Sequence, residues 1–116
     1  MADVNGPAAD PLRKAAAGIL ICGDLHRAFV KAPDFWVIDG AIAAENTLIA
    51  AQALGLGAVW LGTWPRADAV LGQKTLFDLP EHILPHSILA LGWPEGDLTA
   101  PRPDRYEEEK VHWEKW

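Results

Sequence analysis

Two histidines, His82 and His86, stand four residues apart, which is the spacing at which one face of a helix can offer two ligands to a metal ion. Pro85 lies between them and would break that helix, because proline has no N–H to donate and its ring clashes with the preceding turn. Acidic or cysteine ligands do not cluster beside the pair in the sequence. We therefore predict no metal site.

Other familiar catalytic patterns do not occur in the sequence. We find no Ser-His-Asp order, no Walker A sequence and no Gly-x-Gly-x-x-Gly, and Gly55-Leu56-Gly57 follows an expected helix where a dinucleotide fingerprint would open one. The single cysteine, Cys22, ends an apolar run and is expected to be a buried core thiol. Because the sequence has no second cysteine, an internal disulfide is excluded, and this fits a protein of the reducing cytosol.

The stretch that must position any site runs from Asp34 to Gly62, and it predicts a long helix followed by a short strand. Apolar and small residues recur at three- and four-residue steps nearly all round this helix, so we expect it to be buried. Asp34 is a plausible N-cap, and Gly55 is placed to end the helix in the left-handed conformation. Residues 58–61 then have the length and flanks of a core strand.

Asp39 and Asn46 are polar residues on this helix. Because buried polar groups need hydrogen-bond partners, we interpret both as structural residues that bond the backbone of adjoining loops.

The remaining elements are shorter. Residues 1–14 read as a loose lead-in, 18–22 and 87–91 as apolar strands, 66–77 as a short amphipathic helix, and 95–116 as an extended tail rich in proline and glutamate. The order is strand, helix, strand, helix, strand, which by itself favours parallel strands with helical crossovers.

Composition places the chain among small folded domains. It has 116 residues, 50% hydrophobic, and six tryptophans, which argue for a packed core in a single domain spanning residues 1–116. So much apolar surface on so short a chain suggests that a partner chain covers part of it. A net charge of −6 argues against nucleic acid as the main ligand. No apolar run is long enough to cross a membrane, so we expect a cytoplasmic protein.

One string in the chain resembles a known family. Asp39, the asparagine seven residues later at Asn46, the Ala50-Ala51 pair and Gly55-Leu56-Gly57 follow in the order seen in FMN-dependent nitroreductases. The later Leu79-Pro80-Glu81 and Leu91-Gly92-Trp93-Pro94 extend the resemblance, which covers roughly residues 18–116.

The resemblance implies a different sheet from the one that the element order favours. It implies an α+β fold, a three-layer sandwich with a mixed, mostly antiparallel sheet that gains a strand from the partner subunit's C-terminal tail. We follow the resemblance and expect a truncated version of that sandwich, with the order β-α-β-α-β plus the extended tail, in a homodimer.

The same resemblance points to a cofactor site. It implies that Trp60, Leu61 and Gly62 run past the flavin ring, where a backbone N–H approaches the flavin N5 and glycine at position 62 leaves room for the ring. It also implies that Arg105, which precedes Val111-His112, holds the FMN phosphate, with Arg102 as a nearby competitor. His112 is either a ligand-pocket or a tail-packing residue. No catalytic acid or base is named, because the flavin supplies the hydride chemistry.

Two functions follow from these residues. The first is an oxidoreductase that uses FMN to pass a hydride from NAD(P)H to a nitroaromatic, quinone or similar small acceptor. The second is a shortened, flavin-free relative that serves as a dimerising or partner-binding module. The Arg-Arg-Ser segment that opens the family's flavin site has no counterpart in these 116 residues. The chain would then be a fragment, a natural truncation, or one subunit of a split protein.

Overall fold

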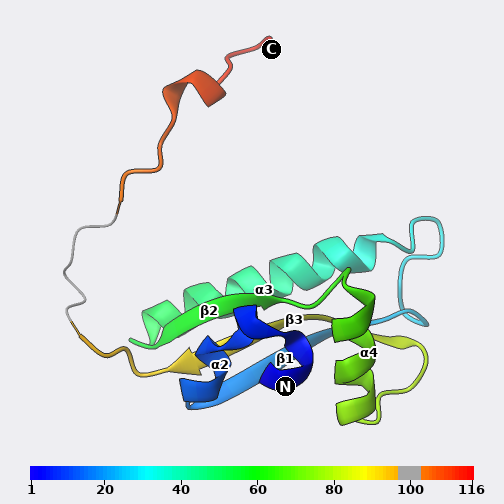
Figure 1. The fold of residues 1–116 in the computed structure, drawn as a ribbon. Coiled ribbons are helices and arrows are strands. Elements are labelled where there is room, and N and C mark those ends of the chain that lie inside the picture. Colours follow the sequence, from blue (N-terminus) through cyan, green and yellow to red (C-terminus); the bar gives the residue numbers. More distant parts are fainter. Residues whose placement is uncertain (97–102) are drawn as a thin grey trace.

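The computed structural model describes residues 1–96 and 103–116, and its helices lie on both faces of a small sheet (Figure 1). Helix α3 covers one face, and α1, α2 and α4 cover the other. The elements in chain order are α1 (Ala2–Asn5), the 3₁₀ turn η1 (Pro7–Ala9), α2 (Pro11–Lys14), β1 (Ala17–Asp24), α3 (Phe35–Ala53), β2 (Gly57–Gly62), α4 (Ala67–Leu76), β3 (Ile83–Gly92) and η2 (Glu108–Lys110).

The described sheet has three strands in the order β1-β3-β2, and both neighbouring pairs are antiparallel. Because β3 lies between them, β1 and β2 run in the same direction without touching, and α3 connects them across one face. The predicted order of elements is therefore confirmed, and the antiparallel sheet implied by the resemblance is found in place of the parallel sheet favoured by the pattern alone.

Helix α3 begins and ends close to where the sequence predicts. Asp34 is the N-cap residue, although its side chain makes no capping hydrogen bond. At the other end Gly55 has a φ of 75°, the left-handed value expected of it. The N–H of Gly55 donates to Gln52 and that of Leu56 to Ala51, which is the pair of bonds of a Schellman motif.

The expectation that α3 is buried all round is wrong for this chain. Its buried residues, Trp36, Gly40, Ala44 and Ala51, form one narrow stripe against the sheet. Ile38, Ile42 and Ile49 lie outside that stripe and are each more than half exposed. A three-layer arrangement of this size leaves the outer face of the helix uncovered, so the apolar circumference of α3 is not explained by packing within the chain.

The lead-in, residues 1–14, is not loose. It folds into α1, η1 and α2, and Asn5 and Ala9 are buried. Gln73 of α4 donates a hydrogen bond to the carbonyl of Met1 over 2.8 Å. The sequence does not predict these short helices, because helices of three or four residues are not stable by themselves and depend on contacts with the rest of the chain.

The buried cluster lies between the N-terminal helices and the sheet. Ala9, Leu61, Ile88 and Ala90 form it, and partly buried residues such as Leu12 and Leu20 pack around it. Cys22 was expected in the core, but it is exposed. It lies on β1, which is an edge strand of the described sheet and leaves its side chains less covered than those of the central β3.

The tail was predicted to be extended over 95–116. Residues 97–102 of that prediction lie outside the described residues. Every residue from 103 to 116 is exposed, and the stretch contains the 3₁₀ turn η2. Among the described residues, no helix has both the length and the apolarity needed to cross a bilayer.

Candidate functional site

The predicted ring-contacting residues occupy the end of β2, and their side chains alternate between the two faces of the sheet. Leu61 pairs with Ile88 and is 6% exposed in the core beside the N-terminal helices. Trp60 and Gly62 pair with Leu89 and Ser87 and belong to the opposite face, the one that α3 covers. The three residues therefore have different surroundings, and only Trp60 and Gly62 can border a ligand on the α3 face.

Gly62 borders open space. A Cβ placed on Gly62 would have no atom of the described chain within 4 Å. Two other glycines on the α3 side are crowded: a Cβ on Gly23 of β1 would lie 2.3 Å from the Trp36 ring, and one on Gly40 of α3 would lie 2.8 Å from the His86 ring. Packing within the chain requires those two glycines but does not require Gly62, so its small size is free to serve a ligand.

The N-terminal segment fixes the end of β2. Asn5 donates from Nδ2 to the Gly62 carbonyl over 3.1 Å, and its Oδ1 accepts a 2.8 Å hydrogen bond from the buried Thr63 hydroxyl. The Arg66 guanidinium donates to the Asn5 carbonyl. These bonds hold the backbone of residues 62 and 63 in one position, as a binding strand requires.

A β-bulge brings His86 to the same face. Ile21 pairs with Ser87 and Cys22 with Pro85, so His86 has no partner opposite it on β1. The N–H groups of Thr63 and Trp64 both donate to the His86 carbonyl. A bulge of this kind redirects one side chain and bends the strand, and here the His86 ring lies against Gly40 of α3.

His86 is the centre of an aromatic cluster beside the end of β2. Its ring lies 5.9 Å from that of Trp36 and 5.7 Å from that of Trp60, and Trp36 lies 5.0 Å from Trp64, in edge-to-face contacts. The side chain is 6% exposed, and burial lowers the pKa of His86 while a hydrogen bond with the Val37 backbone acts in the opposite direction. Its Nδ1 is also 3.1 Å from the Ser87 hydroxyl. The ring is therefore a neutral, fixed packing group near neutral pH.

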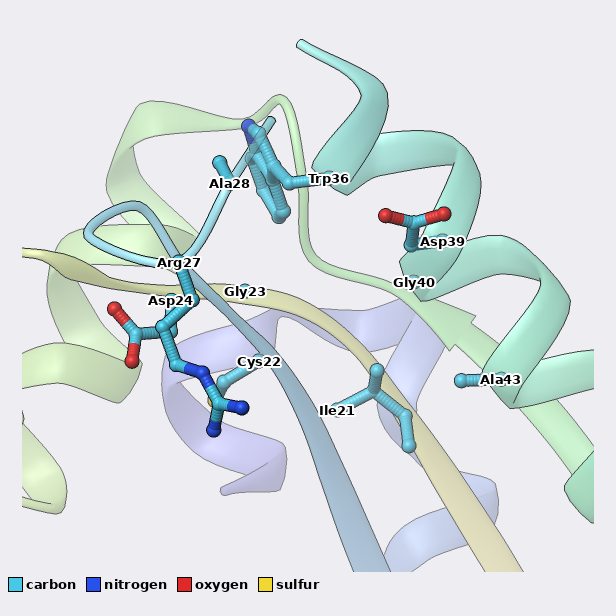
Figure 2. A pocket seen from close by; sticks show the side chains of 10 residues that line it. All are labelled: Ile21, Cys22, Gly23, Asp24, Arg27, Ala28, Trp36, Asp39, Gly40 and Ala43. Carbon is cyan, nitrogen blue, oxygen red and sulfur yellow. The ribbon is translucent and has the colours of Figure 1, made fainter. Parts of the chain in front are cut away.

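A separate cleft of about 320 Å³ lies between β1 and the first half of α3 (Figure 2). Figure 2 shows Trp36 and Asp39 on the helix side and Cys22, Asp24 and Arg27 on the strand and loop side. It does not include the predicted residues at the end of β2. The cleft and Gly62 lie toward opposite edges of the described sheet, because β1 and β2 are its two outer strands.

The structure does not bring Arg105 to this site. Arg105 lies in the exposed tail, and its competitor Arg102 lies outside the described residues. His112 lies beside Trp116 within the tail, with ring centroids 4.3 Å apart and ring planes tilted by 38°. Asp39 and Asn46 are exposed on α3 and do not have the buried structural role expected of them. Their predicted burial followed from the wrong assumption that α3 is enclosed on every side.

Several residues that shape the site were missed by sequence reasoning. Asn5 and Thr63 are separated by 58 positions, and no local pattern connects them. Trp36 contacts Trp64 directly, and it meets the His86 ring because the bulge redirects that side chain. One signal was available: a histidine beside a proline in an apolar strand marks a position where regular pairing is interrupted.

With the geometry in view, comparison with known proteins gives the family. The family model described as "Nitroreductase family" matches residues 5–93, more than half of the chain, so the chain belongs to the nitroreductase family. That match includes the N-terminal segment from Asn5 onward, which our resemblance did not extend to.

Curated relatives agree with this family. The chain is 42% identical over 105 residues to a candidate NADH dehydrogenase/NAD(P)H nitroreductase of Methanothermobacter thermautotrophicus, covering 90% of this chain and 53% of that protein. It is 34% identical over 101 residues to the oxygen-insensitive NADPH nitroreductase of Salmonella typhimurium, covering 78% of this chain and 39% of that one. The chain thus spans about half the length of the first of these relatives, and less of the second.

A solved structure shows the same fold. A candidate NADH oxidase of Clostridium acetobutylicum superposes with a TM-score of 0.87 at 33% identity, covering 97% of this chain and 66% of that one. The α+β fold with helices on both faces of an antiparallel sheet is therefore the nitroreductase fold, as the resemblance implied.

Proposed function

We propose that this chain forms the part of an FMN-dependent NAD(P)H oxidoreductase that borders the flavin ring. The observation that carries the proposal is the open space over Gly62 on the α3 face, at the fixed end of β2. The name of a similar protein supports it. An FMN reductase (NADPH) of Bacillus subtilis is 37% identical to this chain over 68 residues, which are 58% of this chain and 26% of that protein. Acceptors in this proposal are nitroaromatics, quinones or similar small molecules.

The residues at the end of β2 fit one part of FMN. A flat ring needs a strand whose side chains do not block its approach, and Gly62 leaves such room while Trp60 borders it with an aromatic surface. FMN, when bound, supplies the hydride chemistry. The chain's own task is to hold the ring edge with backbone N–H groups that Asn5 and Thr63 keep in place.

The phosphate end of FMN needs a cation from elsewhere. We propose Arg105 for this role, because guanidinium geometry matches phosphate and the tail that carries it is exposed and free to meet a partner. The Arg105→Ala variant is then expected to retain less FMN than the native chain does, and unchanged retention would remove Arg105 from the site.

A homodimer is part of this proposal. Ile38, Ile42 and Ile49 give α3 an exposed apolar face, and Trp113 and Trp116 of the tail are 85% and 100% exposed. A partner of the same sequence offers both a matching apolar face and a second tail. Its tail could also pair with a free edge of the described sheet.

Turnover separates the enzyme from a flavin-free binding module. We expect the chain, supplied with FMN, to accelerate the oxidation of NADH or NADPH by a nitroaromatic or quinone acceptor. The control is free FMN at the same concentration without protein. A rate no greater than that of free FMN, from a folded chain, would favour the alternative of a dimerising or partner-binding module.

A further inference from the structure

Three potential metal ligands meet at the edge of the sheet where β1 ends and β3 begins. Asp24 ends β1, His26 lies two residues further along the following turn, and His82 immediately precedes β3. One carboxylate oxygen and one ring nitrogen from each histidine all lie within 4.8 Å of one another. His82 thus finds its partners across the sheet, and not in His86 along the chain.

The backbone holds these three residues in place. The last pair of the β1–β3 ladder joins Asp24 and Ile83, and the Leu25 N–H donates to the His82 carbonyl over 2.9 Å. The His26 N–H donates to Oδ1 of Asp24 over 3.0 Å, which closes a tight turn. Oδ2 of Asp24 is free of that bond and can face a ligand. Only the side chains then have to adjust when an ion enters.

The side chains are close to ligand geometry without having reached it. The His26 and His82 rings stack with centroids 4.0 Å apart and planes 5° from parallel, and Nε2 of His82 lies 4.0 Å from Oδ1 of Asp24. Zinc ligands at 2.0–2.1 Å in a tetrahedron stand about 3.3 Å from one another. An imidazole nitrogen binds a metal ion in the plane of its own ring, and two parallel stacked rings have no plane in common. For both histidines to bind one ion, the exposed His26 ring therefore has to rotate out of the stack.

The surroundings suit a divalent cation. Asp24 and His82 are each about one-third exposed at the side chain, at 35% and 32%, so water and ions reach them. Glu81 lines the adjoining hollow with His26 and His82 and adds a second carboxylate beside the pair.

We propose that Asp24, His26 and His82 form a site for a divalent transition metal ion of the zinc class. Two imidazole nitrogens and one carboxylate oxygen, with water in the fourth position, are a ligand set that such ions accept. The ion would join the end of β1, the turn after it and the start of β3. This role is structural and independent of flavin binding, so it stands or falls separately from the proposed function.

The test is a titration of the chain, without a histidine tag and freed of metal by chelation, with Zn²⁺ against a chromophoric chelator. We expect one ion per chain. His26→Ala, His82→Ala and Asp24→Asn should each weaken binding at least about tenfold, since even residues that only support ligands cost 10- to 100-fold. Asp24→Asn keeps an oxygen that can accept the His26 N–H, so it removes charge while preserving the turn. His112→Ala, an exposed histidine of the tail, is the matched control and should bind as the native chain does.

Two further readouts distinguish this site from adventitious binding. Co²⁺ should give the visible absorption of a low-coordinate site with nitrogen and oxygen ligands, and Zn²⁺ should raise the unfolding temperature of the native chain but not that of His26→Ala. No saturable Zn²⁺ binding would overturn the proposal. Binding that persists unchanged in both His26→Ala and His82→Ala would overturn it as well.

Discussion

At the scale of single residues, Gly62 and His86 differ in what surrounds them. Gly62 borders space that no described atom of the chain fills, whereas His86 fills the space that Gly40 leaves. A substitution at Gly62 should therefore affect a ligand without affecting the fold, and a change at His86 should affect the fold first.

Gly62→Leu is the residue-scale test of the flavin site. We expect FMN affinity to fall at least about tenfold, roughly 1.4 kcal/mol, because the new side chain would occupy the space proposed for the ring. The unfolding midpoint should hardly change, because a Cβ there meets nothing within 4 Å. Fluorescence quenching of FMN measures the affinity.

Gly57→Ala is the control for that variant. It lies at the other end of β2, where a Cβ would make ordinary contact at 3.5 Å with the Gly92 carbonyl, and it should leave FMN affinity unchanged. Equal loss of affinity in both variants would show that the strand is sensitive to any substitution and would remove Gly62 from the site.

His86 gives a prediction for pH. Burial lowers its pKa in the folded chain below the ordinary 6.5, so near and below pH 6.5 the unfolded chain binds a proton that the folded chain does not. The contribution of the neutral His86 to the free energy of unfolding should be fully present above pH 6.5. It should be lost as the pH falls through the lower pKa of His86 in the folded chain. Chemical denaturation at a series of pH values, in the presence of a chelator, measures this slope.

The slope belongs to His86 if His86→Gln flattens it relative to the native chain. His112→Gln removes an exposed histidine of the tail and should retain the native slope. A slope that survives in His86→Gln would assign the pH dependence to other groups.

The residues that could be predicted from the sequence are those with a local signature. Gly55 was found because a left-handed glycine ends a helix. The role of Gly62 rests on the resemblance and stays a prediction. Asn5 and Thr63 could not be found, because they meet across 58 positions of the chain. For His86, the neighbouring Pro85 signals interrupted strand pairing, but the side chains that the ring meets depend on contacts between distant segments.

At the scale of elements, α3 packs on the sheet through a narrow stripe formed by Trp36 and the small residues Gly40, Ala44 and Ala51. Gly40 allows the His86 ring to lie directly against the backbone of α3. Gly23 allows the Trp36 ring to lie directly against the backbone of β1. The periodicity of the sequence predicted the bounds of α3 well. It could not show which face meets the sheet, because apolar residues surround the helix almost completely.

Gly40→Ala tests this packing. In most helix interiors this change is stabilising by up to about 1 kcal/mol, but here the added Cβ would lie 2.8 Å from the His86 ring. We expect a net loss of about 1 kcal/mol or more in the free energy of unfolding, measured by denaturant titration. Asn46→Ala on the exposed side of α3 should change stability by no more than about 0.5 kcal/mol.

The cost of Gly40→Ala should also shrink in a His86→Ala background, because the clash is then absent. If Gly40→Ala stabilises the native chain as it would in an ordinary helix, the close contact between α3 and His86 is wrong.

At the scale of the whole molecule, the chain folds as a nitroreductase-like sandwich while leaving much apolar surface uncovered. Ile42 of α3 and Trp113 of the tail are 55% and 85% exposed, and β1 and β2 each have a free edge in the described sheet. A second copy would cover these surfaces, and in our proposal its tail brings Arg105, the residue proposed for the FMN phosphate, to the end of β2. The excess of apolar residues in the sequence predicts a partner chain, and that prediction stays open. Where such a partner would bind depends on contacts between chains, which the sequence of one chain does not specify.

The central claim is that two copies of this chain hold FMN beside the end of β2. Gel filtration of the chain with added FMN, monitored by light scattering and by visible absorbance, tests it most directly. We predict a dimer whose peak carries a flavin spectrum, and we predict that Gly62→Leu elutes as the same dimer without the flavin. A folded chain that elutes as a monomer, or as a dimer from which all flavin separates, would contradict the account.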